Sequence, residues 1–248
     1  MQNETTAAIV TGGSRGIGQA IAIALGGEGF GVAVAYSGSV TGAADTVDRI
    51  VTAGGRAIAV QADVADAEAV ERLFTAAEEA FGTIQVVAHA AGTSSLTTLS
   101  ELDLGELDAV LRTNVRGTLV VDQQAARRVG PGGAIVNIAS SATRMQAAGN
   151  IAYIASKGAV EAITLAFARE LAGRDITVNA VSPGPILTDM LGSYLAGPGG
   201  ETVRGDLESR SPLGRIGEPR DIAEIVTFLT TAGRWINGQV IHANGGIA

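Results

Sequence analysis

Short apolar segments alternate with longer helical patterns along almost the whole chain. This alternation is typical of βαβ units, in which helices connect parallel strands and cover both faces of the sheet. Runs that are apolar at nearly every position fit strands that are buried on both faces. We expect strands at 7–10, 31–35, 57–62, 84–88, 134–138, 177–181 and 240–242, and helices at 17–26, 42–53, 67–81, 104–129, 151–171 and 218–230.

The pattern predicts an α/β protein with a doubly wound parallel sheet of about seven strands and helices on both faces. The length of 248 residues favours one domain, a Rossmann fold over residues 1–248. One long irregular stretch, 183–212, is rich in Gly, Pro and Ser. Ligands bind near the strand ends of such sheets, so we interpret this stretch as a substrate loop. The alternative is an ordinary surface loop.

Composition excludes several classes of function. The formal net charge is −8 and there is no Lys/Arg run, which argues against nucleic-acid binding. No uninterrupted apolar stretch reaches about 18 residues, so we expect no membrane span. Residues 1–6 lack a basic flank and an apolar core, which predicts no signal peptide and a cytoplasmic protein. With no cysteine and two histidines, His89 and His242, we expect no metal site.

A glycine-rich segment, TGGSRGIG at 11–18, follows the first expected strand and opens the first expected helix. Gly12 permits a tight turn, Gly16 lets the backbone approach a pyrophosphate, and Gly18 lets the helix pack closely on the sheet. The helix N-terminus adds free N–H groups and a partial positive charge. The spacing differs from the commoner G-x-G-x-x-G, but the strand–turn–helix context predicts a dinucleotide-binding turn rather than an ordinary one.

The end of the second strand indicates which dinucleotide binds. An NAD site usually carries an acid there, to bond the ribose hydroxyls. This chain has Tyr36 and Ser37 instead. The guanidinium of Arg15 and the hydroxyl of Ser37 suit a 2′-phosphate. We therefore favour NADP(H); the alternative for Arg15 is a solvated surface charge.

Tyr153 and Lys157 stand four residues apart, and Ser140 lies thirteen residues before Tyr153. Positions i and i+4 share one face of a helix. A phenol has a pKa of about 10, and a cation about 4 Å away favours the phenolate by roughly 4 kcal/mol. The pair therefore predicts a tyrosine whose pKa is lowered toward neutrality, where general acid–base catalysis works best. Taken alone, the spacing also fits a solvated Lys beside a half-buried Tyr.

Together these motifs resemble the short-chain dehydrogenase/reductase family over almost the whole chain. The pattern is most similar to the branch that reduces 3-oxoacyl thioesters on acyl carrier protein. The matching segments are the glycine turn, Asp63-Val64, Ala90-Ala91-Gly92, Asn114, Ser140, Tyr153 with Lys157, Ser182-Pro183-Gly184 with Thr188, 215–219 and 237–239. One departure is His89-Ala90, where the family usually has two asparagines; the first of these supports the central sheet. The loss of that asparagine puts its support of the sheet in doubt, and His89 could substitute as a hydrogen-bonding group. We favour a structural rather than a catalytic role for His89 and interpret His242 as structural too.

The resemblance implies a catalytic set of Asn114, Ser140, Tyr153 and Lys157. Tyr153 would exchange a proton with the substrate oxygen, and Ser140 would donate a hydrogen bond to that oxygen. Lys157 would bind the nicotinamide ribose and lower the pKa of Tyr153, while Asn114 would hold a water molecule that connects Lys157 to solvent. The hydride chemistry belongs to the cofactor.

The resemblance also implies two larger sets of residues. The implied cofactor contacts are Gly12, Ser14, Arg15, Gly16, Ile17, Gly18, Tyr36, Ser37, Asp63, Val64, Ala90, Ala91, Gly92, Tyr153, Lys157, Pro183, Gly184, Ile186 and Thr188. The implied substrate pocket is lined by Ser140, Ala142, Met145, Gln146, Tyr153, Leu187 and Met190, with Thr93 and Ala148 as further candidates.

The expected function is that of an NADPH-dependent oxidoreductase that reduces a ketone, an aldehyde or a 3-oxoacyl thioester to an alcohol. One alternative is an NAD-dependent alcohol or polyol dehydrogenase of the same family, and another is a dinucleotide sensor without turnover. By resemblance we expect a homotetramer that pairs the helices at 104–129 and 151–171. Arg127, Arg128 and Arg174 are either a patch for an acidic carrier protein or solvated charges.

Overall fold

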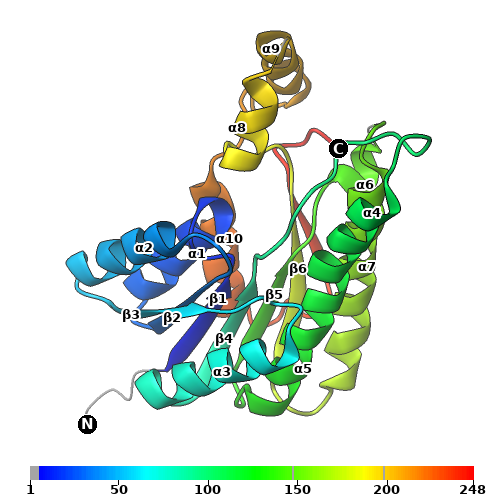
Figure 1. Ribbon diagram of the computed structural model, residues 1–248. Coiled ribbons are helices and arrows are strands. Elements are labelled where there is room, and N and C mark those ends of the chain that lie inside the picture. Colours follow the sequence, from blue (N-terminus) through cyan, green and yellow to red (C-terminus); the bar gives the residue numbers. More distant parts are fainter. Residues whose placement is uncertain (1–5, 147, 198) are drawn as a thin grey trace.

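A computed structural model describes residues 6–146, 148–197 and 199–248, so the signal-peptide prediction for residues 1–6 falls almost entirely outside the described residues. Seven parallel strands form one sheet in the order β3-β2-β1-β4-β5-β6-β7 (Figure 1). The strands are β1 (Ala7–Thr11), β2 (Gly31–Tyr36), β3 (Arg56–Gln61), β4 (Ile84–His89), β5 (Ala134–Ile138), β6 (Thr177–Pro183) and β7 (Val240–Ala243). The strand order reverses direction between β1 and β4, which is where ligands bind in such sheets. The predicted doubly wound parallel sheet is confirmed.

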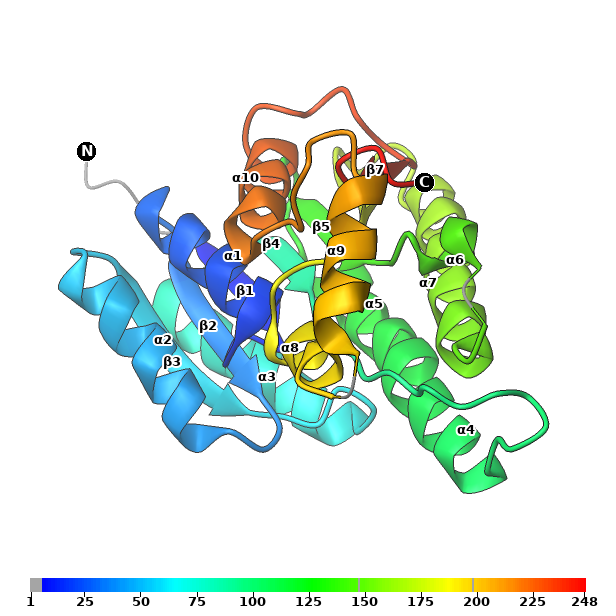
Figure 2. The same ribbon diagram turned by 90° about the horizontal axis from the view of Figure 1, so that it is seen from above.

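Helices cover both faces of the sheet, as Figure 2 shows from above the carboxyl ends of the strands. One face, here called the α1 face, is covered by α1 (Gly16–Gly27), α2 (Val40–Thr52) and α10 (Pro219–Thr230). The opposite face, the α7 face, is covered by α3 (Ala67–Phe81), α5 (Gly117–Arg128) and α7 (Ile151–Glu170).

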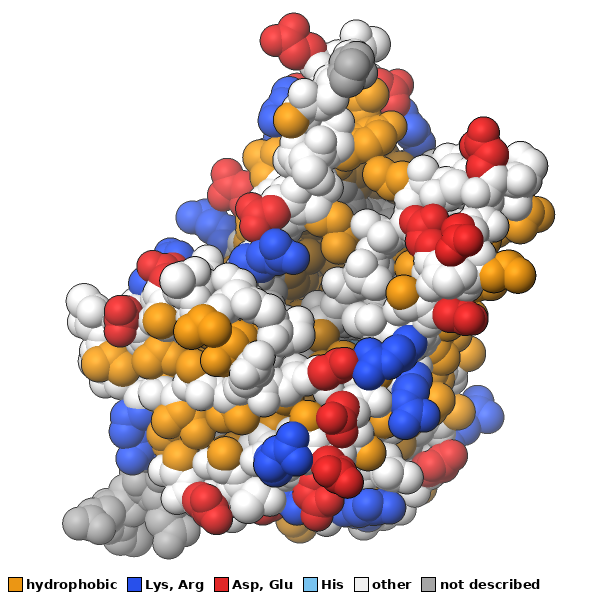
Figure 3. All heavy atoms as spheres, viewed as in Figure 1, with side chains coloured by type: hydrophobic (Ala, Val, Ile, Leu, Met, Phe, Trp, Pro, Cys, Tyr) orange, Lys and Arg blue, Asp and Glu red, His pale blue; other side chains and the backbone are white. Residues whose placement is uncertain are grey.

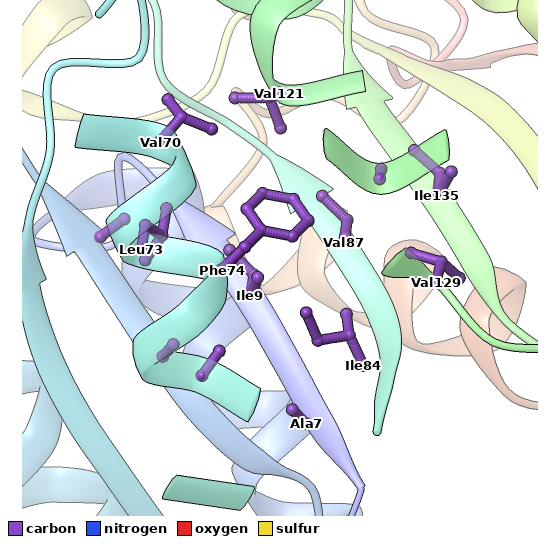
Figure 4. Packing of buried hydrophobic residues seen from close by; sticks show 14 of the residues in the cluster. Ala7, Ile9, Val70, Leu73, Phe74, Ile84, Val87, Val121, Val129 and Ile135 are labelled. Atoms are coloured by element: carbon purple, nitrogen blue, oxygen red, sulfur yellow. The ribbon is translucent and has the colours of Figure 1, made fainter. Parts of the chain in front are cut away.

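Each face buries its own apolar core. On the α7 face, Phe74 of α3 lies among Ile9, Ile84, Val87 and Val121 (Figure 4). On the α1 face, side chains from α1 and α10 pack on the strands, including Ile21, Leu25, Ile222, Val226 and Leu229. Strand side chains alternate between the two faces, so a nearly continuous apolar strand supplies both cores.

The helix predicted at 104–129 contains a π-helical segment. It consists of α4 (Leu104–Leu111), a π-helical segment η1 (Arg112–Arg116) and α5. Asn114 lies in the π segment and is buried, and its amide bonds the backbone of Thr93 and the hydroxyl of Ser156. Single π turns inside α-helices occur frequently at functional sites. The predicted helical stretch is therefore confirmed over residues 104–128, whereas its π-helical segment was not predicted.

The stretch 183–212, predicted as irregular, is largely helical. It contains α8 (Asp189–Leu195) and α9 (Gly200–Arg210), which project above the carboxyl edge of the sheet (Figures 1 and 2). Sequence analysis missed these helices because glycine is frequent in both loops and this stretch. Two ion pairs one turn apart on α9, Arg204–Glu208 and Asp206–Arg210, support helix formation. A short helix after Ser140, α6 (Ala142–Met145), was also not predicted.

By length and hydropathy, α7 qualifies as a membrane-spanning helix, with 20 residues and a hydropathy of 1.4. In the fold it packs against β5 and β6 and buries Ser156, Lys157 and Thr164. Core helices of globular proteins pass the same test, so this feature is weak support for a membrane span.

Candidate active site

The glycine turn lies over the ends of β1 and β2, and a side chain at its glycines would meet neighbouring atoms. The N–H of Gly13 donates to the carbonyl oxygen of Ala35 at 3.0 Å. Gly12 and Gly16 have φ angles of 64° and 55°, which favour glycine. A Cβ on Gly18 would lie 2.2 Å from the carbonyl oxygen of Gly12. The turn therefore presents bare backbone at the start of α1, as a pyrophosphate site requires.

Helix α2 holds the turn from the side. The hydroxyl of Thr46 donates to the carbonyl oxygen of Gly13 at 2.9 Å, and a Cβ on Gly42 would lie 2.4 Å from the carbonyl oxygen of Ser14. Sequence analysis missed Thr46. Its only local signal is a polar residue on the buried side of an amphipathic helix.

Arg15 lies at the open side of the turn. Its side chain is 73% exposed, and its guanidinium is 3.8 Å from the carboxylate of Asp189 on α8. At the end of β2, Tyr36 is half-buried and Ser37 is exposed. This arrangement leaves a cation and a hydroxyl, with no acid at position 36 or 37, near the expected ribose site.

Asp63, which follows β3, forms an ion pair that the sequence did not indicate. Its carboxylate lies 2.8 Å from the guanidinium of Arg112 and accepts a hydrogen bond from the N–H of Ala65 at 3.0 Å. Partial burial acts to raise the pKa of Asp63, but the bond from Ala65 and the charge of Arg112 outweigh it and lower the pKa. The carboxylate is therefore ionised and held in place.

The segment Ala90-Ala91-Gly92 lies between the turn and the polar residues of α7. The N–H of Ala91 donates to the hydroxyl of Thr11 at 3.1 Å, and a Cβ on Gly12 would lie 2.9 Å from Ala91. A Cβ on Gly92 would lie 3.3 Å from both the ammonium of Lys157 and the side-chain oxygen of Asn114. The structure thus brings the predicted cofactor residues of β1 and β4 together with two predicted catalytic residues.

The loop after β6 closes the same edge of the sheet. The N–H of Ser141 donates to the carbonyl oxygen of Pro183 at 2.8 Å. A Cβ on Gly184 would lie 2.9 Å from Asn244, so only glycine fits there without a shift. The methyl group of Thr188 lies close to Gly16, 3.1 Å from where a Cβ on that glycine would stand.

Lys157 and Asn114 are buried and hydrogen-bonded. The ammonium of Lys157 donates to the carbonyl oxygen of Ile138 at 2.7 Å. The amide of Asn114 donates to the carbonyl oxygen of Thr93 at 2.8 Å and to the hydroxyl of Ser156 at 2.9 Å, and Ser156 donates to the carbonyl oxygen of Tyr153 at 2.7 Å. Burial lowers the pKa of Lys157 to about 8. Sequence analysis missed Ser156, although it lies next to Lys157.

Tyr153 differs from the prediction in its pKa. Burial raises the pKa of the phenol, and the hydrogen bond with Ser140 opposes that shift only in part. The ammonium of Lys157 is 5.9 Å from the centre of the Tyr153 ring and is directed at Ile138. The predicted lowering of the phenol's pKa was therefore wrong in this structure, because loss of water outweighs a cation that bonds elsewhere.

The predicted pocket residues come from two walls. Ala142, Met145 and Gln146 belong to α6 and its C-terminal end, directly after Ser140. Leu187 lies just before α8 and is 38% exposed, and Met190 lies in the first turn of α8 and is 47% exposed. Figure 3 shows a hollow in the surface between the lobe of α8 and α9 and the region of α4 and α6 across from it, with hydrophobic side chains on both sides.

A separate cavity of about 260 Å³ lies behind the loop that carries α8 and α9. Of the predicted cofactor residues it contacts Ile186, and it contacts none of the predicted pocket residues. Its lining residues are Pro185, Ile186, Leu207, Ser211, Leu213, Arg215, Ile216, Gly217, Asp221, Ile222, Ile225 and His242 to Ile247.

Two of the three arginines considered for a carrier-protein patch are engaged within the chain. Arg128 lies 3.1 Å from Glu78 and 4.0 Å from Glu71. The guanidinium of Arg174 donates to the backbone carbonyl oxygens of Ala126 and Val129. These contacts favour the interpretation as ordinary surface charges.

Comparison with known proteins identifies the family. A family model described as Enoyl-(Acyl carrier protein) reductase matches residues 12–248. An uncharacterized oxidoreductase of Methylorubrum extorquens is 41% identical over 245 residues, covering 98% of each chain. A 3-oxoacyl-[acyl-carrier-protein] reductase FabG of Staphylococcus aureus is 38% identical over 246 residues, again covering 98% of each chain.

A crystal structure of a short chain dehydrogenase from Burkholderia cenocepacia in complex with NADP has a TM-score of 0.90 and 41% identity, and the match covers 98% of both chains. The full-length matches in sequence and structure agree with the turn, the strand order and the Tyr153–Lys157 helix. The chain therefore belongs to the short-chain dehydrogenase/reductase family of oxidoreductases.

Proposed function

We propose that this protein is an NADPH-dependent reductase that converts a carbonyl group to an alcohol. The observation that carries the proposal is the convergence of Ser140, Tyr153, Lys157 and Asn114 at the carboxyl edge of the sheet, next to the glycine turn. The similarity to a 3-oxoacyl-[acyl-carrier-protein] reductase and to an NADP-bound dehydrogenase supports it.

The residues around the turn fit a nicotinamide dinucleotide phosphate. The backbone at Gly12, Gly16 and Gly18 leaves the space that a pyrophosphate needs, and the exposed Arg15 offers a guanidinium to a 2′-phosphate. Asp63, Ala91 and Thr188 lie around the same site and would contact the rest of the cofactor. When bound, the cofactor supplies the hydride.

Tyr153 is the proton donor in this proposal. Because its pKa is raised, the phenol carries its proton at neutral pH, which is the form that protonates a carbonyl oxygen. Ser140 bonds Tyr153 and would donate a hydrogen bond to the same oxygen as negative charge develops there. Lys157 holds a positive charge close by, and the bonds of Asn114 to Thr93 and Ser156 fix the geometry around it.

The substrate we propose is a ketone, an aldehyde or a 3-oxoacyl thioester with an apolar substituent. Apolar side chains on the two predicted walls support this class: Ala142 and Met145 belong to α6, and the exposed Leu187 and Met190 lie at α8. An NAD site usually carries an acid at the end of the second strand, and this chain has Tyr36 and Ser37 there. These two residues do not favour the NAD-dependent alternative.

The decisive experiment measures oxidation of NADPH and NADH at the nicotinamide absorbance band with a panel of ketones, aldehydes and 3-oxoacyl thioesters. We expect turnover with NADPH and an apolar carbonyl compound. The matched variant Tyr153→Phe keeps the ring but removes the hydroxyl, and we expect it to bind NADPH normally and to lose about 10²–10⁴-fold in kcat. Retained turnover in Tyr153→Phe, or a clear preference for NADH in the wild type, contradicts the proposal.

We also propose a homotetramer that forms through α5 and α7. Both helices carry exposed apolar side chains, Leu119 on α5 and Ile151 and Leu165 on α7, which a helix pairing would bury. Size-exclusion chromatography with light scattering tests this assembly, and a stable monomer contradicts it.

A further inference from the structure

Three buried polar residues stand side by side at the ends of neighbouring strands. Thr11 of β1 is in register with His89 of β4, and His89 is in register with Asn137 of β5. All three are at most 2% exposed. Residues paired in this way point to the same side of the sheet, and the bond of Asn137 to Asp122 of α5 shows that this is the α7 face.

The hydrogen bonds of Thr11 determine where the proton of His89 lies. The N–H of Ala91 donates to the Thr11 hydroxyl oxygen at 3.1 Å, and the same hydroxyl lies 2.8 Å from Nδ1 of His89. The hydroxyl accepts from Ala91, and within the described residues its own proton has no acceptor other than Nδ1, so we assign Nδ1 as the acceptor of that proton. A neutral imidazole with an acceptor at Nδ1 carries its proton on Nε2.

The surroundings favour this neutral ring. Burial, and then the nearby positive charge of Lys157 on α7, lower the pKa of His89 to about 3. Two further ionisable groups lie on this face: Asp122 of α5, whose pKa burial raises to about 7, and Tyr153 of α7, whose pKa burial also raises. The remaining neighbours that form the row and its bonds, Thr11, Asn137 and Thr164, do not ionise.

On the other side of His89, the bonds of Asn137 define a matching acceptor. Its side-chain NH₂ donates to the carboxylate of Asp122 at 3.0 Å and to the hydroxyl of Thr164 at 3.1 Å, and Thr164 donates onward to the carbonyl oxygen of Val160 at 2.8 Å. The side-chain oxygen of Asn137 is left as an acceptor. Within the described residues, this oxygen and Nε2 of His89 are both buried without a partner. A buried polar atom without a partner destabilises the fold, so a bond between these two atoms is favoured.

We propose that His89 is a positioning residue whose Nε2–H donates to the side-chain oxygen of Asn137, directly or through one buried water molecule. One directed chain of hydrogen bonds then runs from Ala91 through Thr11, His89 and Asn137 to Asp122 and Thr164. It crosses three strands and joins the cofactor turn to α5 and α7.

The position of Ala91 explains why this chain matters for activity. The backbone of Ala91 packs directly on Gly12 of the turn, and the next residue, Gly92, faces Lys157 and Asn114. His89 holds Ala91 through Thr11, so loss of its imidazole would loosen the segment between the cofactor and Lys157. This consequence rests on the proposed function, whereas the hydrogen-bond chain does not.

The first experiment is independent of activity. The chain has two histidines, so nitrogen-15 NMR of the imidazoles gives two sets of signals, which His242→Gln assigns. We expect His89 in the Nε2–H form, with a ring N–H proton that exchanges slowly with water and does not titrate between pH 8 and about 5. The Nδ1–H form, a rapidly exchanging proton, or titration near pH 6.5 overturns the proposal.

The second experiment separates positioning from stability. His89→Leu removes both hydrogen bonds, and we expect the KM for NADPH to rise about tenfold while kcat changes much less. His89→Asn keeps an acceptor and a donor, and we expect it to recover most of the affinity. The control Val87→Ala, two residues earlier in the core of the same face, lowers stability but leaves KM unchanged.

An unchanged KM in His89→Leu, or an equal rise in Val87→Ala, overturns the positioning role. If the wild type oxidises no NADPH with any carbonyl compound, the proposed function fails, and the NMR measurement still decides the state of His89.

Discussion

The two faces of the sheet are built alike until the strands reach their carboxyl ends, where they differ. Neighbouring strands contribute one residue each to a row that crosses the sheet. Across β2, β1, β4 and β5, the last complete row on the α1 face is apolar and consists of Val34, Val10, Ala88 and Val136, and β6 continues it with Asn179. The next row, on the α7 face, consists of Ala35, Thr11, His89 and Asn137.

The difference shows what each face does. On the α1 face, α1 and α10 pack on apolar side chains of these four strands. On the α7 face, Asp122 and Thr164 accept hydrogen bonds from Asn137, so this polar strand residue can be buried without a large penalty. The same helices carry Tyr153 and Lys157, so the polar face is also the one with the proposed chemistry.

The largest effect should come from the polar face. Lys157→Met removes the buried cation, and we expect kcat/KM for carbonyl reduction to fall about 10²–10⁴-fold. In the wild type, the same cation is lost as the pH rises through about 8, the pKa of Lys157, so reduction should decline above that pH. A pH–rate profile of both proteins checks this prediction, and a wild-type rate that stays constant to pH 10 contradicts it.

A change on the apolar face should affect stability alone. Leu25 is fully buried on α1, and Leu25→Ala should lower the free energy of unfolding by about 2–5 kcal/mol. The activity per folded molecule should not change, because no polar partner is touched. Urea denaturation and kinetics on the same samples measure both quantities. If activity falls far more than the folded fraction, the two faces are not separable in this way.

A change at Asp122 measures how much stability the α7 face loses by burying an ionisable group. Its pKa is raised from 3.8 to about 7, first of all by burial, so the folded state keeps a proton that the unfolded state loses. Stability should therefore fall as the pH rises from about 4 to about 7 and then level off. Asp122→Asn cannot ionise and should be more stable than the wild type above pH 7, by about 2 kcal/mol, with little difference near pH 4. Denaturation at both pH values measures the difference, and a less stable variant at pH 8 contradicts the prediction.

The smallest effect should come from Arg15, which is exposed at the open side of the glycine turn. Arg15→Ala should reduce the preference for NADPH over NADH by about fivefold, because a solvated guanidinium contributes only about 1 kcal/mol to binding a phosphate. Arg72→Ala removes an equally exposed arginine on α3 and is the matched control. Ratios of kcat/KM for the two cofactors measure the preference. An unchanged ratio in Arg15→Ala shows that another residue recognises the phosphate.

Sequence patterns predicted the strands and the glycine turn well, because both depend on neighbours in the chain. The runs at 7–10 and 134–138 became β1 and β5, with at most one residue added. The π-helical segment around Asn114 was not visible, and the side chain of Asn114 bonds Thr93, 21 residues away, which no local pattern indicates. The helices within 183–212 were missed because their glycines resemble loop composition.

The candidate site shows the same division. Ser140, Tyr153, Lys157 and Asn114 were recognisable from their motifs, and the structure brings them to one edge of the sheet. Neither the raised pKa of Tyr153 nor the lowered pKa of Lys157 was predictable, because each depends on how much water the fold excludes. The ion pair of Asp63 with Arg112 joins residues 49 positions apart and left no local pattern.

The sequence by itself determined the class of fold and the position of the glycine turn, because hydrophobic periodicity and the lack of a side chain in glycine act locally, and the family resemblance supplied the candidate catalytic residues. Only the tertiary structure decided which polar groups meet, as in the row from Thr11 through His89 to Asn137. Strand register and helix packing place those groups together, and burial then sets their protonation. These are properties of residues distant in the chain, and no local pattern contains them.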